Sequence, residues 1–200
     1  MRTTLFLSLL FVLLWSCKSD KKDHPRNTTN VISNSGKALS SMDEMEEKVK
    51  ELKDLTPMSN EDFMAWLPKE IDGMPRTNLS MGYPMMAEVS AIEAVYSNQD
   101  KSKEIKLNVI DRAGEMGAGA TIGLTQMFAM NFDKTTNNGY KKTVTKNGIK
   151  AVEQFFIKQN RTELQMLVNN DRFYVHLEAK GCNPEQSWDI IDQFSFKNLE

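Results

Sequence analysis

The stretch that decides the fold is residues 140–179, which read YKKTVTKNGIKAVEQFFIKQNRTELQMLVNNDRFYVHLEA. Four short runs bounded by turn-forming residues predict four β-strands. Asn147-Gly148 between the first two runs is typical of a tight type I′ hairpin turn. Because all three loops are too short for a crossover, we expect the strands to be sequential antiparallel neighbours. The predicted strands are residues 140–146, 149–158, 162–169 and 172–179.

The segments on either side of this stretch add strands and helices. Two further strands are predicted upstream, and helical spacing or helix-capping residues predict three helices. In the last helix, Asn183 and Gln186 form a capping-box pattern around Pro184. The strands are residues 87–97 and 104–112, and the helices are residues 60–67, 114–132 and 183–194. This order predicts an α+β fold, an antiparallel sheet of about six strands covered by helices in an α/β/α sandwich.

The first seventeen residues have the pattern of an export signal. Arg2 precedes an apolar run from Leu5 to Leu14, and small Ser16 follows before Cys17. A run of about ten apolar residues is too short to cross a bilayer, which needs roughly twenty. Leu14-Trp15-Ser16-Cys17 resembles the lipobox of bacterial lipoproteins, although Trp15 is bulky for its position. The alternative is an ordinary signal peptide with an incidental cysteine.

The lipobox resemblance implies cleavage before Cys17 and a lipid on that cysteine, which would hold the protein on a bacterial membrane. Several acyl chains anchor far better than one, because each buried methylene contributes about 0.8 kcal/mol. Lys18 stands where some bacteria place an aspartate that retains lipoproteins in the inner membrane. The resemblance therefore favours the outer membrane, with the domain in the periplasm or at the cell surface.

The chain divides into four parts. Residues 1–16 form the signal peptide, and polar residues 17–40 form a lipidated flexible tether. Residues 41–56 are predicted to be an amphipathic helix with one narrow apolar stripe, which could dock on the domain or on a partner helix, although a solvated helix is favoured. Residues 57–200 form the single α+β domain.

The charge balance argues against a nucleic-acid-binding protein, and the cysteine content bears on whether a disulfide can form. Removal of residues 1–16 takes away only Arg2 among the 25 basic residues, so 24 basic residues face 27 acidic ones. This balance argues against a nucleic-acid partner, which would require a basic surface. With Cys17 lipidated, Cys182 is the only thiol left, so an internal disulfide is excluded.

The domain also resembles a known group. The hairpin in NGIKAVEQFF, the strand pair ELQMLV and RFYVHLEA, and the ending WDIIDQFSF are similar to the PsbP-like group. This group includes thylakoid extrinsic proteins, a nuclear transport factor and DcrB-like bacterial lipoproteins. The resemblance spans about residues 60–196 and implies a non-enzymatic sandwich used for docking or assembly.

Four patterns of residues are candidate sites. Gly117 to Gly123 follows a strand, but its spacing is one residue too long for a dinucleotide loop, which favours close helix packing. Asp111 and Arg112 could line a cleft or pair at the surface, and the surface is favoured. His176 and Cys182 could form a nucleophilic pair in a hydrolase-like enzyme, but a half-exposed histidine is the simpler interpretation.

The fourth pattern is a group of methionines. Met74, Met81, Met85 and Met86 could bind monovalent copper in an exported carrier, although core packing is favoured. His24 in the tether has no accompanying metal-ligand pattern. We therefore predict no metal, no cofactor and no catalytic residue, and one modified residue, Cys17. The favoured function is a non-catalytic binding or assembly module in the cell envelope, with the membrane and an envelope protein as partners.

Overall fold

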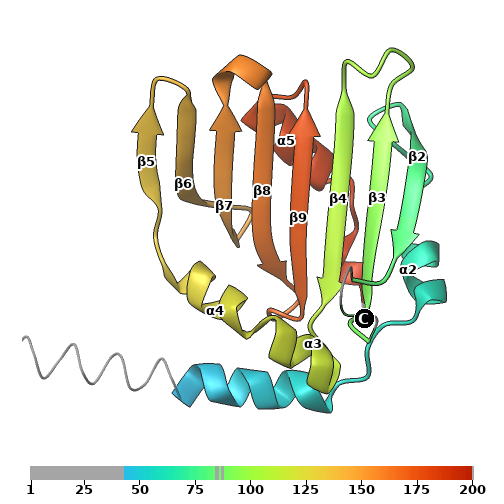
Figure 1. Cartoon of the computed structure of the whole chain (residues 1–200), viewed down its shortest axis with the longest axis vertical. Helices are drawn as coiled ribbons and strands as arrows, with labels where there is room; N and C mark the ends of the chain where they lie inside the picture. The colour runs from blue at the N-terminus through green and yellow to red at the C-terminus, as the bar shows by residue number, and fades with distance from the viewer. Residues whose placement is uncertain (1–42, 84–85, 87, 200) are drawn as a thin grey trace, which may run out of the picture. The chain divides into compact units, whose positions relative to one another are not determined.

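The computed structural model describes residues 43–83, 86 and 88–199 (Figure 1). The signal peptide, the tether with Cys17 and His24, and Met85 lie outside the described residues. The start of the predicted helix over residues 41–56 also lies outside them, and residues 43–54 are helical.

The described residues form an α+β domain with one antiparallel sheet, as the sequence predicts. The sheet has nine strands, so the prediction of about six was too low. The strands are β1 (Glu70–Ile71), β2 (Met74–Met81), β3 (Ala91–Ser97), β4 (Glu104–Asp111), β5 (Asp133–Thr136), β6 (Gly139–Lys146), β7 (Ile149–Phe156), β8 (Arg161–Val168) and β9 (Phe173–Lys180). The three unpredicted strands, β1, β2 and β5, lie toward the two edges of the sheet, where few side chains are buried.

The sheet consists of two meanders joined side by side. Its order is β1-β2-β3-β4-β9-β8-β7-β6-β5, so β1–β4 and β5–β9 each run in sequence and meet where β4 pairs with β9. Leu107 of β4 lies opposite Leu177 of β9 at this joint. Helices α3 (Gly114–Ala120) and α4 (Ile122–Ala129) carry the chain from the centre of the sheet to its far edge at β5 (Figure 1).

One face of the sheet, here called the core face, packs against α5 (Pro184–Ile191) and α2 (Asn60–Trp66). The inward side of α5 consists of Trp188, Ile190 and Ile191, and all three are buried. Asn183 and Gln186 form the predicted capping box. The central strands contribute alternate residues to this core, which on β4 are Ile105, Leu107 and Val109, and on β9 are Phe173, Val175, Leu177 and Ala179.

A buried carboxylate inside this core is fully paired. Glu153 of β7 accepts hydrogen bonds from Trp188 Nε1 and from the Tyr140 hydroxyl, each at 2.7 Å. Lys142 Nζ lies 3.5 Å from the same carboxylate. Burial, together with the Glu153 carboxylate, raises the pKa of Tyr140, so its hydroxyl keeps its proton and remains a donor. A buried charge is tolerated when it is paired in this way.

The predicted single helix over residues 114–132 is in fact two helices. Thr121 lies between α3 and α4 with φ −110° and ψ 9°, outside the helical region. Its hydroxyl donates to Gly117 O at 2.6 Å and accepts from Arg112 Nε at 3.1 Å. These side-chain hydrogen bonds compete with the regular helical pattern, which explains the break.

Candidate functional site

The strand side chains that point away from α5 form a second face, which is partly open to solvent. On β9 this face carries Tyr174, His176 and Glu178, each of intermediate exposure. A cavity of about 560 Å³ lies on this face. Its lining comes from β2, β3, β4, β9 and the segment after β2: Ser80, Gly82, Tyr83, Ala91, Ile92, Glu93, Lys106, Asn108, Val109, Ile110, Tyr174, His176 and Glu178.

His176 lies at the centre of the second face. The register places it between Asn108 of β4 and Gln165 of β8. In the part of the chain that the structure describes, His176 Nε2 is the one buried side-chain nitrogen or oxygen without a hydrogen-bond partner. Such an atom costs roughly 1–3 kcal/mol, which a ligand that hydrogen-bonds it would recover. The ligand would have to displace the side chains that bury this nitrogen.

The charge on His176 is controlled by its surroundings. Burial lowers the pKa of His176 below 6.5, and the two lysine and arginine neighbours, Lys106 and Arg161, lower it further. Glu163 and Glu178 act in the opposite direction, but burial is the largest influence. The imidazole is therefore neutral at pH 7 and can offer one donor and one acceptor nitrogen.

Charged pairs surround this histidine. Lys106 Nζ lies 2.8 Å from Glu93 Oε2, across β3 and β4. Arg161 Nη1 lies 2.9 Å from Glu163 Oε1 and 3.2 Å from Glu178 Oε2. These half-exposed pairs contribute little to stability. They do place both signs of charge around one cavity, which suits a polar partner.

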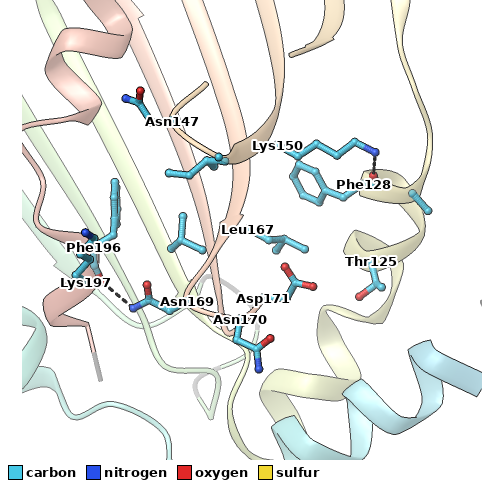
Figure 2. Close-up of a pocket in the computed structure, with 14 residues that line it drawn as sticks. Thr125, Phe128, Asn147, Lys150, Leu167, Asn169, Asn170, Asp171, Phe196 and Lys197 are labelled. Carbon is cyan, nitrogen blue, oxygen red and sulfur yellow. Dashed lines mark hydrogen bonds between the residues drawn. The ribbon is translucent and has the colours of Figure 1, made fainter. Parts of the chain in front are cut away.

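A second hollow, of about 610 Å³, lies at one end of the sheet (Figure 2). It is bounded by α4, by the β6–β7 and β8–β9 turns, and by residues 196–197. Figure 2 shows Thr125 and Phe128 of α4 pointing into this hollow. Lys150 Nζ donates to Phe128 O at 2.7 Å, and Asn169 Nδ2 donates to Phe196 O and Leu199 O, both at 2.6 Å.

The polar groups of this hollow are mostly occupied in holding the fold together. Asn169, Asn170 and Asp171 have φ of 52°, 53° and 62°, a left-handed run that asparagine and aspartate tolerate best. The Asn169 amide uses this turn to hold the chain's C-terminal segment. We therefore regard the cavity at His176 as the better candidate for a binding site.

Asp111 and Arg112 neither line a cleft nor lie at the surface, so both sequence interpretations were wrong. Both residues are fully buried. Asp111 accepts from Met58 N at 2.7 Å, Ala113 N at 2.9 Å, and Arg172 Nε and Nη2 at 3.1 and 2.9 Å. Arg112 donates to Thr121, Thr125 and the carbonyl of Asp171. The two residues join β4, α3–α4 and the β8–β9 turn, which is a structural role.

The structure does not bring His176 and Cys182 together. Cys182 is fully buried and belongs to the core on the α5 side of the sheet, whereas His176 points to the second face. Burial raises the pKa of the Cys182 thiol. A protonated thiol is a poor nucleophile.

The methionines of the candidate copper segment do not gather around His176. Met74 is part of the core, and Met81 packs against it. Met81 pairs with buried Ile92, which fixes its side chain on the core face. The neighbouring residue Ser80 faces the His176 cavity instead. Met86 is exposed.

The glycine segment packs as the sequence analysis favoured. A Cβ at Gly117 would come within 2.9 Å of the backbone of Asp111 and Arg112, so this position must be glycine for α3 to lie against the end of β4. Gly119 and Gly123 have open space around them. The adjoining strands are antiparallel, unlike those of a dinucleotide-binding unit.

Within residues 43–83, 86 and 88–199, no three or more His, Cys, Asp or Glu side chains are grouped so that they could hold a metal ion. In the same residues, none of the helices has the length and apolar character needed to cross a membrane. No family model, curated protein or solved structure matches the chain.

Sequence reasoning identified His176 but did not bring Glu93, Lys106 and Asn108 to it. These three residues come from β3 and β4, and only the strand register places them beside β9. Alternation shows that Lys106 and Asn108 share a face of β4, but not which strand lies next to that face. The pairing of β4 with β9 joins the two meanders and has no local signal.

Proposed function

We propose that this protein is a bacterial lipoprotein, anchored through lipid on Cys17, whose domain binds another component of the cell envelope without catalysing a reaction. The observation that carries the proposal is the second face, where a cavity, two groups of ion pairs and a buried unpartnered histidine nitrogen lie together. The outer membrane is the proposed location, with the domain in the periplasm or at the cell surface.

The sequence supports the anchor. The order of Arg2, the apolar run and Ser16 before Cys17 fits a lipoprotein signal. The polar residues 18–40 that follow suit a tether, because they contain too few apolar side chains to form a core. A domain at the end of such a tether can search for a partner near the membrane surface.

The arrangement of helices supports a PsbP-like sandwich, which we also propose. Helix α5 covers the core face, and α4 covers one end of the second face through the contact of Phe128 with Tyr174, whose ring centroids are 6.3 Å apart. This leaves the part of the second face around His176 free for a partner, as a docking module requires.

Site-specific photo-crosslinking in cells tests the proposal. A photoreactive amino acid replaces Gln165 on the second face, and the matched control replaces Asp189 on the solvent side of α5. We expect one dominant adduct from position 165 and none from position 189. The adduct should disappear in the Cys17→Ser variant. Equal adducts from both positions, or none from either, would contradict the proposal.

A small-ligand carrier is the second candidate, because the cavity volume and the unpartnered Nε2 suit a compact polar molecule. Native mass spectrometry of protein purified from the producing cells, compared with the His176→Phe variant, tests it. A bound small molecule that is lost in the variant would support carriage. Identical spectra without added mass would exclude this candidate.

A thiol assay tests the enzyme alternative. Because Cys182 is buried and its pKa is raised, we expect it to react with a disulfide reagent only after unfolding. The assay uses the Cys17→Ser mature chain, in which Cys182 is the only thiol. Rapid reaction of the folded protein near pH 7 would support a nucleophilic role for Cys182.

Calorimetric titration with monovalent copper tests the metal-carrier alternative. Absence of binding would exclude that alternative.

A further inference from the structure

The solvent side of α3–α4 is almost uncharged. Met116 and Ile122 are each 44% exposed and Met130, which follows α4, is 52% exposed. Glu115 is the only charged residue among residues 113–132, in a chain that is 26% charged. On α5 the exposed positions are polar, among them Glu185, Gln186 and Asp189. Several exposed apolar side chains with so few charges between them are typical of an interaction surface.

The helices present this surface from a fixed position. On the inward side of α4, Phe128 is buried against Tyr174, and Lys150 Nζ holds the carbonyl of Phe128 (Figure 2). Arg112 binds the hydroxyls of Thr121 and Thr125. These contacts on its inward side keep α4 from rotating about its axis. Ile122 and Met130 therefore remain exposed.

We infer that α3–α4 lies on the surface of the bilayer that holds the anchor, with Met116, Ile122 and Met130 among the lipid headgroups. This inference rests on the proposed anchor at Cys17. A flexible chain as long as residues 18–40, the proposed tether, has a typical end-to-end span of roughly 25–30 Å. The first described helix, over residues 43–54, lies at the same end of the domain as α3 and α4 (Figure 1). The tether therefore brings this end close to lipid.

The charges at this end select the type of lipid. No lysine or arginine occurs in residues 113–132, and the adjoining helix over residues 43–54 has six acidic and three basic residues. Attraction to anionic lipid is therefore weak, and apolar contact at the boundary between neutral headgroups and acyl chains must dominate. Three half-exposed side chains bury too little area for tight binding alone. The tether compensates by keeping their effective concentration high.

Fluorescence on vesicles tests the inference. Full-length lipidated protein carries an environment-sensitive dye at Ile122→Cys, and the control carries it at Ile157→Cys. Ile157 is 53% exposed and lies in the turn between β7 and β8, at the opposite end of the sheet. Cys182 is buried, so the dye goes to the introduced cysteine. In phosphatidylcholine vesicles with nitroxide-labelled headgroups, we expect at least threefold quenching at position 122 and none at position 157.

A second arm separates this inference from the anchor itself. The Cys17→Ser mature chain is attached through an N-terminal histidine tag to phosphatidylcholine vesicles with chelating lipid, and the same two positions are compared. Quenching at position 122 in this arm would uphold the inference even if mass spectrometry found no lipid on Cys17 of the full-length protein, a result that would reject the anchor alone. Equal quenching at the two positions in both arms would overturn the inference, as would Met130→Asp with Met116→Asp leaving the quenching at position 122 unchanged.

Discussion

Helices α5 and α3–α4 differ in how they distribute their apolar side chains between the sheet and the solvent. Both pack against the nine-stranded sheet, but α5 divides its residues sharply, with Trp188, Ile190 and Ile191 buried and charged residues outside. Helix α4 buries only Phe128 and leaves Ile122 exposed. An amphipathic helix needs only the domain as its partner, whereas one that is apolar on both sides has a surface still to be covered. The difference separates the part of the molecule that stabilises the fold from the part available for interaction.

The largest expected effect comes from placing a charge on each helix at a matched isoleucine. Ile190→Asp in α5 buries an unpaired carboxylate, and we expect a loss of at least about 4 kcal/mol or failure to fold. Ile122→Asp in α4 should change the free energy of unfolding by less than about 0.5 kcal/mol, because the site is exposed. Urea denaturation measures both. Similar losses at the two positions would show that the outward side of α4 is part of the core.

A pair of glycines in α3 tests how tightly that helix lies on the sheet. Gly117→Ala forces a Cβ to 2.9 Å from the backbone of Asp111 and Arg112, and we expect a loss of about 1–3 kcal/mol. Gly119→Ala has open space and should stabilise the helix by about 0.5–1 kcal/mol. Thermal unfolding of the two variants gives the comparison. A neutral result at Gly117 would mean that α3 can move away from β4 at little cost.

The smallest expected effect concerns the face that α3–α4 leaves open. Because burial lowers the pKa of His176, the unfolded chain takes up a proton at higher pH than the folded domain does. Stability from this group is therefore complete above pH 6.5 and decreases as the pH falls toward the lowered value. Denaturation of the wild type and His176→Gln between pH 7.5 and 5.5 measures the difference. If both lose stability equally over this range, His176 is not the group responsible.

The sequence predicted the parts of the fold that have strong local patterns. Alternation located β4, β8 and β9, the Asn147-Gly148 turn located the β6–β7 hairpin, and the capping box located the start of α5. Strands β1, β2 and β5 were missed because they lack alternation: all four residues of β5 are exposed, and β2 contains Pro75 and a register shift between Arg76 and Asn78. Edge strands are shaped by the neighbour they pair with more than by their own sequence.

The candidate site was predicted less well, for a physical reason. Asp111 and Arg112 looked like surface residues because isolated charges are seldom buried. Their burial depends on Arg172 and Asp171, about sixty residues further along the chain, which no local pattern reveals. The half-exposed state of His176 did follow from its strand, since Phe173, Val175 and Leu177 alternate with it.

The joint between the two meanders also has a consequence for folding. Every strand pair except β4–β9 joins neighbours in the sequence, so most of the sheet can form from local contacts. The pairing of β4 with β9 closes a loop from Asp111 to Phe173 and carries the entropic cost of that closure. We expect this pairing to limit the folding rate. Shortening the segment between β4 and β5 should then accelerate folding more than shortening any hairpin turn.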